Sequence, residues 1–135
     1  MRPTVYICSP YTGGDIQFNL QLARKYAAKA VESNYAPIVP HLYVPDFVDE
    51  VLDREIGMDI AKSIAIMTDY FWICGERYSR GMRDEIATRV KNNPTCIYEA
   101  NFREKLFYLH QVTNFSRFWH DTCDTTIFMW SCYPF

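Results

Sequence analysis

The chain has 135 residues, of which 49% are hydrophobic, 22% are charged and 16% are aromatic. A chain of this length and composition forms one globular domain, which excludes disordered, collagen-like and coiled-coil proteins. The formal net charge of −2 argues against a protein that coats nucleic acid, because such proteins carry a basic excess. Ten of the 22 aromatic residues lie within 102–135, so the end of the chain differs in composition from the rest.

No apolar run approaches the roughly 18 residues that a membrane-spanning helix needs, and the N-terminus lacks the pattern of a signal peptide. The five cysteines form an odd set without Cys-x-x-Cys spacing, which favours free thiols in a reducing cytosol. His120 and Cys123 are close in sequence, but a zinc site needs a second pair of ligands. We therefore predict a cytoplasmic protein with no membrane contact, no metal and no cofactor.

The first half of the chain has two predicted strands around a helix. A β-favouring run over residues 5–8 ends at a dense loop signal with two glycines. Apolar residues then recur at spacings of three and four over residues 16–31, which predicts a helix with Asp15 as its N-cap and Asn34 as its stop. Residues 37–40 are predicted to form the second strand.

The second half repeats this alternation after a mixed, acidic segment. That segment predicts a loop or short helix, followed by a helix over residues 53–67. The apolar, aromatic run over residues 70–74 is typical of a buried central strand. A helix is expected to begin after Ser79 and to stop at 92–94, and residues 95–98 are predicted to form the fourth strand.

Strands and helices thus alternate over residues 5–98, and the strands are continuous apolar runs. This pattern predicts an α/β fold with a parallel sheet of four to five strands and helices on both faces. In such open sheets, ligands bind beyond the carboxyl ends of the strands. The loops after Cys8, Pro40 and Cys74 are therefore the candidate site loops.

The whole chain is expected to be one domain, with a core over residues 1–100 and an aromatic-rich extension over residues 101–135. A helix is predicted over residues 101–110, where Phe102 and Leu106 begin a stripe at helical spacing. The aromatic side chains beyond this helix cannot all face water. We expect them to pack on the sheet edge or on a partner subunit.

The first two loops offer groups that bind ligands in other proteins. The candidates in the first loop are Ser9, Tyr11, Thr12 and Gly13. Its glycines allow close approach and the following helix N-terminus favours an anion, although an ordinary turn between strand and helix explains the pattern equally well. His41, after the second strand, either binds a ligand or ties the loop to the main chain, and we favour the second role.

The third loop leads into a helix that begins with polar residues. Ser79 is a natural N-cap, and Gly81 allows close approach. Asp84 and Glu85 lie near the positive end of the helix, which favours ionised carboxylates such as glycosyl transfer needs. Acidic residues are also common in a first helical turn, and Met82 stands where a capping box would have an acidic residue or its amide. These residues alone make Glu85 a candidate.

Four blocks of the chain resemble, in order, small bacterial and phage proteins related to the nucleoside 2-deoxyribosyltransferases. The blocks read VYICSPYTG, PIVPH, DYFWICG and SRGMRDEI and lie within residues 5–98. The resemblance implies a flavodoxin-like doubly wound fold and a homodimer or larger homo-oligomer with sites near subunit contacts. It also implies a glutamate nucleophile at the start of a helix, which Glu85 matches.

The spacing of Ser79, Gly81 and Glu85 is similar to that of the deoxynucleoside 5′-monophosphate N-glycosidases within this group. A serine hydroxyl and a helix N-terminus suit a phosphate, so the resemblance favours a nucleotide over a free nucleoside. Arg80 and Met82 lie in the same loop and join the expected substrate-binding residues. For Arg80 the alternative, which we favour, is a solvent-exposed side chain.

Other residues match the group less closely. The resemblance implies that Tyr11, Thr12 and Gly13 border the base and sugar. Asp59 is the nearest match to a helix aspartate that holds a sugar hydroxyl or assists the leaving base, with a solvated helix residue as the equal alternative. Asp69 matches an aspartate at the start of a strand, where we expect a structural role.

The leading hypothesis is an N-glycosidase or 2-deoxyribosyltransferase-like enzyme that cleaves the N-glycosidic bond of a nucleoside or deoxynucleoside 5′-monophosphate. A covalent glycosyl ester on Glu85 is the expected intermediate. The alternative is a catalytically inactive protein, of a kind that a phage encodes, that binds or sequesters a nucleotide. A domain that mainly mediates assembly is the third hypothesis. Hydrolysis and transfer are not separated by the sequence.

Overall fold

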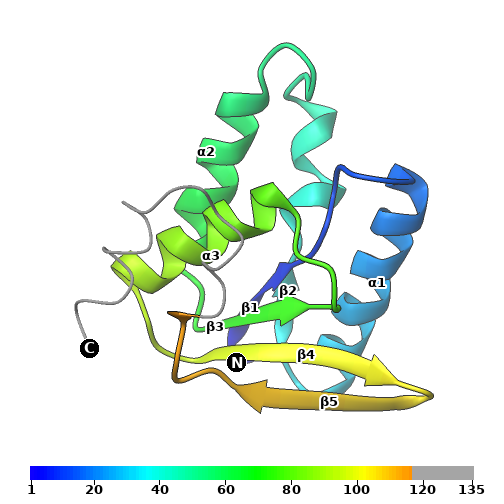
Figure 1. Cartoon of the computed structure of the whole chain (residues 1–135), viewed down its shortest axis with the longest axis vertical. Coiled ribbons are helices and arrows are strands. Elements are labelled where there is room, and N and C mark those ends of the chain that lie inside the picture. Colours follow the sequence, from blue (N-terminus) through cyan, green and yellow to red (C-terminus); the bar gives the residue numbers. More distant parts are fainter. Residues whose placement is uncertain (117–135) are drawn as a thin grey trace.

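The structure is a computed structural model that describes residues 1–116. Within them, five strands form one sheet in the order β2-β1-β3-β4-β5 (Figure 1). The strands are β1 (Thr4–Cys8), β2 (Ala36–Ile38), β3 (Tyr70–Cys74), β4 (Ile97–Arg103) and β5 (Leu106–Gln111). The helices are α1 (Ile16–Glu32), α2 (Arg54–Ala65) and α3 (Arg80–Asn92), with two short 3₁₀ helices, η1 (Pro40–Leu42) and η2 (Val44–Asp46).

The sheet is mostly parallel. Strands β2, β1, β3 and β4 run parallel to their neighbours, and β5 pairs with β4 in the antiparallel sense. The strand order is that of a flavodoxin-like doubly wound sheet. In such a sheet β2 is added on one side of β1, and β3 and the later strands are added on the other side. The predicted α/β fold is confirmed.

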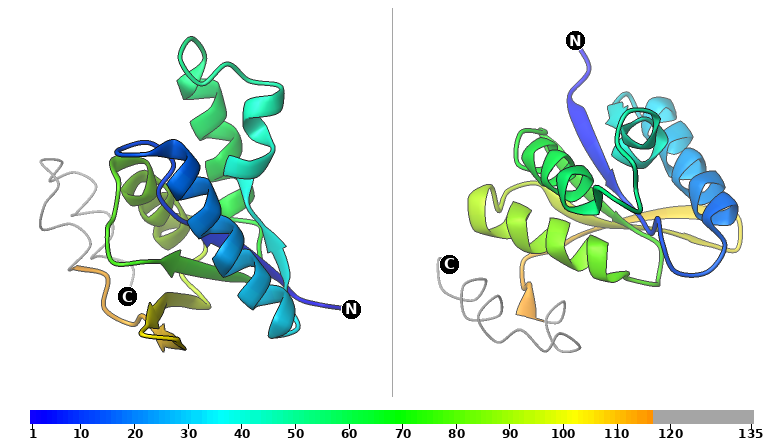
Figure 2. Two further views of the ribbon diagram at one scale, coloured as in Figure 1. Left: turned by 90° about the vertical axis from the view of Figure 1, so that its right-hand side faces the viewer. Right: turned by 90° about the horizontal axis from the view of Figure 1, so that it is seen from above.

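The helices cover both faces of the sheet (Figure 2). Val5 and Ile7 of β1 pack into a buried cluster with α1, whereas Tyr6 and Cys8 pack into a second cluster with α2 and α3. Successive side chains of a strand point to opposite faces, so a strand covered on both sides has apolar residues throughout. This is why the strands of the core appear in the sequence as continuous apolar runs.

The predicted N-caps of α1 and α3 and the predicted stop after α1 are confirmed. The Asp15 side chain caps α1 by accepting a hydrogen bond from the Gln17 amide at 2.9 Å, and Asn34 has a φ of 72° just beyond the helix. Ser79 caps α3 by accepting from the Met82 amide at 3.2 Å. The Ser79 amide donates in return to the Met82 sulfur at 3.4 Å, so a thioether completes the capping box instead of a carboxylate.

The predicted helix over residues 101–110 is wrong. That segment contains the end of β4, a turn at Glu104 with a φ of 60°, and all but the last residue of β5. Phe102 of β4 pairs with Phe107 of β5, and their rings lie 5.1 Å apart. Because the Phe102 ring also contacts Tyr26 of α1 at 5.1 Å, packing on the α1 face favours the hairpin over the helix.

Two hydrogen bonds connect the amino ends of the neighbouring strands β1 and β3. The Asp69 carboxylate accepts from the Thr4 amide at 2.9 Å, and the Asp69 amide donates to the Thr4 hydroxyl at 2.9 Å. These bonds join the start of β1 to the start of β3. The structural role expected for Asp69 is confirmed.

Arg89 on α3 is fully buried and holds the end of α2 against α3. One terminal nitrogen of its guanidinium, Nη1, donates to the carbonyl oxygens of Ala65 and Thr68, both at 2.8 Å. The other, Nη2, donates to the Thr95 carbonyl at 2.8 Å. Burial lowers the pKa of Arg89, but an arginine remains charged at any physiological pH. The cation therefore compensates the partial negative charge of a helix C-terminus.

The first apolar residues after β5 return to the core, because Val112 and Phe115 are buried in the cluster beneath α2 and α3. The expected packing of the aromatic end and the pair of His120 and Cys123 fall within 117–135, outside the described residues. In residues 1–116, no helix combines the length and apolar character that crossing a membrane requires. The cytoplasmic location and the homo-oligomer stay predictions.

Candidate active site at the carboxyl ends of β1 and β3

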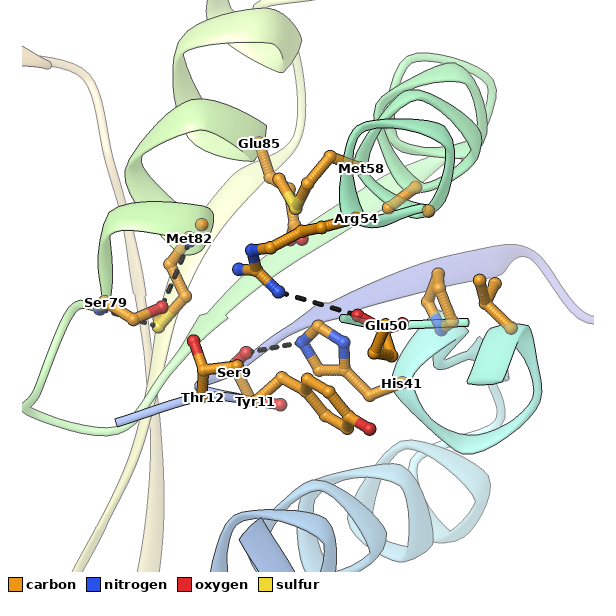
Figure 3. Close-up of a pocket in the computed structure, with 15 residues that line it drawn as sticks. Ser9, Tyr11, Thr12, His41, Glu50, Arg54, Met58, Ser79, Met82 and Glu85 are labelled. Carbon is orange, nitrogen blue, oxygen red and sulfur yellow. Dashed lines mark hydrogen bonds and ion pairs between the residues drawn. The ribbon is translucent and has the colours of Figure 1, made fainter. Parts of the chain in front are cut away.

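A pocket lies at the carboxyl ends of β1 and β3, where the order in which strands are added to the sheet reverses. Its walls come from the loop after β1, from η1 and η2, from α2 and from the start of α3 (Figure 3). Eight of the residues predicted for the site line it together: Ser9, Tyr11, Thr12, His41, Ser79, Gly81, Met82 and Glu85. The pocket measures about 410 Å³ with the solvent at its mouth, but the space that the centre of a water molecule can occupy is about 20 Å³. This space holds one water molecule, so a larger ligand must displace lining side chains.

Glu85 is the acidic group at the bottom of the pocket. It lies in the second turn of α3, directed toward β1, and is 1% exposed. Its Oε2 atom and the Tyr6 hydroxyl have no hydrogen-bond partner of good geometry among residues 1–116. An unpartnered carboxylate oxygen is costly in a protein interior, and such groups concentrate at sites that bind or react with a ligand.

Burial raises the pKa of Glu85 from its ordinary value of 4.5 to about 7. Cys8 and Tyr6 oppose this shift, because their thiol and hydroxyl hydrogens favour the carboxylate form. Burial also raises the pKa values of Tyr6 and Cys8 well above their ordinary range, so both groups keep their protons at neutral pH. Glu85 therefore changes protonation state near neutrality, as acids, bases and nucleophiles of active sites often do.

Tyr6→Phe is expected to raise the pKa of Glu85, because the substitution removes a hydroxyl that favours the carboxylate. The ring stacks on Phe71 at 5.1 Å and is kept, so the loss of stability should stay below about 1 kcal/mol. NMR titration of ¹³C-labelled glutamate carboxyls measures the shift. Tyr26→Phe, on the opposite face of the sheet, is the control and should leave this titration unchanged. A Glu85 pKa that stays the same or falls in Tyr6→Phe would contradict this account.

His41 connects the second loop to the first. Its Nε2 atom lies 2.7 Å from the Ser9 carbonyl oxygen, and because a carbonyl accepts, Nε2 carries the proton. Burial lowers the pKa of His41, so the ring is neutral at pH 7. The ring stacks on Tyr11 with centroids 5.1 Å apart. His41 therefore has the structural role that the sequence favoured, and it forms one wall of the pocket with Tyr11.

Three predicted site residues do not line the pocket. Asp59 and Arg80 are exposed, because the inner face of α2 presents Met58 and Ala61 and the Arg80 side chain leaves the start of α3 toward solvent. Gly13 has a φ of 88°, and a Cβ there would lie 3.0 Å from the Arg77 side chain. Its role is to make a turn against Arg77, outside the pocket.

One wall of the pocket, formed by α2 and the segment before it, was not predicted from the sequence. Seven lining residues were not predicted: Pro40, Val44, Glu50, Arg54, Gly57, Met58 and Ala61. Glu50 and Arg54 form an ion pair of 3.5 Å at a spacing of four residues. Their spacing is that of an ion pair on a helix, but Glu50 precedes α2, so the spacing does not indicate that the pair faces the pocket.

No group of three or more His, Cys, Asp or Glu side chains within residues 1–116 is arranged to hold a metal ion. The lining offers instead two carboxyl groups, hydroxyl groups, one guanidinium and the amides at the start of α3. Such a set suits an anionic organic ligand with hydroxyl groups.

The strand order and the position of the pocket define an α/β protein of the flavodoxin-like, doubly wound class. The chain belongs to the family described as "Domain of unknown function (DUF7768)", which matches residues 3–99. That range contains every residue that lines the pocket described above. Neither the search of curated proteins nor the search of solved structures gave a match.

Proposed function

We propose that the protein is an N-glycosidase or 2-deoxyribosyltransferase-like enzyme that acts on a nucleoside or deoxynucleoside 5′-monophosphate. The observation that carries the proposal is the buried, unpartnered carboxylate oxygen of Glu85 in a pocket beside the N-terminus of α3. A carboxylate in this position is suited to attack a sugar carbon whose phosphate is bound at the helix end.

The start of α3 supplies the phosphate subsite. The Ser79 hydroxyl oxygen accepts from the Met82 amide, which leaves its own hydrogen for a phosphate oxygen. Gly81 has no side chain, and the Arg54 guanidinium and the Met58 sulfur occupy the space beside it, 3.5 and 3.7 Å from where a Cβ would lie. A phosphate therefore approaches the first turn when these two flexible side chains move aside. The positive end of the helix favours the negative charge of such a ligand.

In the proposed reaction, a Glu85 oxygen attacks C1′ of the sugar. The bond from C1′ to the base nitrogen breaks, and its electron pair leaves with the base, which takes up a proton from solvent. Water or a second base then attacks C1′ of the ester, which releases the Glu85 carboxylate and leaves the proton of the attacking group to solvent. Two inversions at one carbon give net retention.

Base release from each of the common ribo- and deoxynucleoside 5′-monophosphates, followed by chromatography across pH 5 to 9, tests the proposal. Because the nucleophile must be ionised, kcat/KM is expected to fall about tenfold per pH unit below about 7 and to level off above it. The same incubations without protein are the control. Absence of base release from every nucleotide, or release fastest at acid pH, would contradict the assignment.

A protein that binds a nucleotide without turnover is the second candidate. Its specific support is the pKa of about 7, which leaves part of the Glu85 population protonated, and that part non-nucleophilic, at neutral pH. In the same incubations this candidate requires that the intact nucleotide is recovered from the protein and that no free base is formed. Rapid base release excludes it.

A further inference from the structure

Arg54 is the permanent cation of the pocket. Among the described residues that line it, Arg54 and His41 are the basic ones, and His41 is neutral at pH 7. The Arg54 side chain extends from the start of α2 across the pocket toward the first turn of α3 (Figure 3). A Cβ placed on Gly81 would lie 3.5 Å from Nη2 of Arg54, so this guanidinium stands at the helix N-terminus.

The Arg54 guanidinium is held in this position by a weak bond. Its Nη1 atom lies 3.5 Å from Oε2 of Glu50, at the limit of a hydrogen bond. The side chains are 41% and 24% exposed, respectively, and a partly exposed pair with one long contact contributes little. A phosphate dianion offers several oxygens to the planar guanidinium and accepts two parallel hydrogen bonds from it. Such a ligand can therefore replace Glu50 as the partner of Arg54.

Two further groups in the pocket also await a ligand. The Ser9 hydroxyl is buried, lines the pocket and has no hydrogen-bond partner within residues 1–116. Oε2 of Glu85 also lacks a partner of good geometry there, although the Tyr6 hydroxyl and the Cys8 thiol are near enough to favour the carboxylate form. Both atoms lie deeper than the guanidinium, since Ser9 is 0% exposed and Glu85 is 1% exposed. A ligand with a polar body and a terminal anion would satisfy the two buried atoms with its body and Arg54 with its charge.

We propose that Arg54 selects ligands that carry a terminal phosphate, by exchanging its bond to Glu50 for bonds to the phosphate at the N-terminus of α3. The inference rests on the proposed function for the class of ligand, and it assigns the selectivity to a residue of α2. Arg80, which was expected among the substrate-binding residues, is exposed and has no part in this selectivity.

Isothermal titration of the whole chain with the four common deoxynucleoside 5′-monophosphates and with their nucleosides tests this assignment. Arg54→Met keeps the length of the side chain and is expected to raise Kd for the monophosphates at least 30-fold, with Kd for the nucleosides within threefold of wild type. Arg54→Lys should give an intermediate loss, because it keeps a point charge but not the planar pair of donors. Arg24→Met, which removes an exposed arginine of α1 outside the pocket, is the matched control, with no change above twofold. Unchanged thermal melting of each variant confirms that it folds.

Glu50→Gln tests the exchange of partners. Because it removes the internal competitor for Arg54, Kd for the monophosphates should fall by three- to tenfold. Glu55→Gln makes the same change of charge at an exposed position and should alter Kd by less than twofold. Equal effects of the two variants would show that overall charge acts instead of the ion pair, and would overturn the exchange.

The outcomes separate this inference from the proposed function. Phosphate-dependent binding that is lost in Arg54→Met, without release of any base, would keep the inference and refute the enzyme. Base release at equal kcat/KM from nucleosides and monophosphates, in wild type and in Arg54→Met alike, would keep the enzyme and overturn the inference. Failure of all eight probes to bind would overturn the inference as well.

Discussion

Glu85→Gln is expected to abolish base release while making the folded protein more stable above pH 7. Glutamine has no nucleophilic oxygen, so kcat should fall by a factor on the order of 10⁴ or more. The gain in stability follows from the raised pKa of Glu85. A buried carboxyl group that must ionise at neutral pH lowers the free energy of unfolding, and an uncharged amide removes that cost.

The sign and the pH range follow from the two pKa values of Glu85. Between its ordinary pKa of 4.5 and its folded value of about 7, the folded state holds a proton that the unfolded state has lost. The contribution of Glu85 to stability is therefore largest below pH 4.5, falls by about 1.4 kcal/mol per pH unit through this window, and levels off above it. The total loss is about 3 kcal/mol. Glu85→Gln should match wild type near pH 4 and exceed it by about 3 kcal/mol at pH 8.

Urea denaturation at pH 4, 6 and 8 measures this difference. Glu76→Gln, at an exposed position in the loop after β3, is the control and should change stability by less than about 0.5 kcal/mol at each pH. A Glu85→Gln variant that is less stable than wild type at pH 8 would mean that the folded protein stabilises the carboxylate. The site would then hold an ordinary ionised glutamate, and the predicted pH dependence of the rate would fail with it.

Arg89→Met is expected to have the largest destabilising effect of the substitutions considered, about 3 to 5 kcal/mol at pH 7. Methionine fills much of the same volume but has no donors, so the carbonyl groups of Ala65, Thr68 and Thr95 lose their common partner inside the protein. The cost is high because these oxygens become unsatisfied, not because the cation itself was favourable to bury.

Arg89→Lys should lose less stability than Arg89→Met, because one ammonium group can still serve part of the carbonyl cluster. Arg24→Met removes an exposed arginine from α1 and is the control, with a change within about 0.5 kcal/mol. Guanidinium chloride unfolding of the three variants gives the order. Equal stability of Arg89→Met and Arg24→Met would show that the carbonyl groups find other partners.

The core of the fold could be predicted because its strands are buried on both faces and its helices have clear ends. The strand over residues 70–74 was predicted with its exact bounds. A run of five apolar residues in an α/β chain is typical of a buried strand and too short for a buried helix. The prediction of a helix over residues 101–110 was wrong because Phe102 and Leu106 mimic helical spacing, and because the turn between them lacks a glycine or asparagine. Cross-strand packing of Phe102 on Phe107 and Tyr26 decided the structure there, and this contact is invisible to local periodicity.

The candidate site was predictable where it lies on loops that follow strands, and less so where it lies on α2. The carboxyl ends of parallel strands meet at one edge, so Ser9, His41 and Glu85 could be expected together. Which side of a helix faces the pocket depends on a rotation of 100° per residue, and Met58 faces it whereas Asp59 does not. The guanidinium of Arg54 reaches the pocket because its side chain is long enough to extend across it. No local sequence pattern specifies the direction of that side chain.

The antiparallel β5 has a consequence for how members of the family can differ. The family match ends at residue 99, within β4, and β5 begins only at Leu106. Within residues 1–116, β4 is the one strand that pairs with β5, at the edge of the sheet, whereas the pocket lies at β1 and β3. Relatives can therefore exchange, lengthen or lose this edge without altering the chemistry of the pocket. The edge strand and the central pocket can therefore change independently of each other.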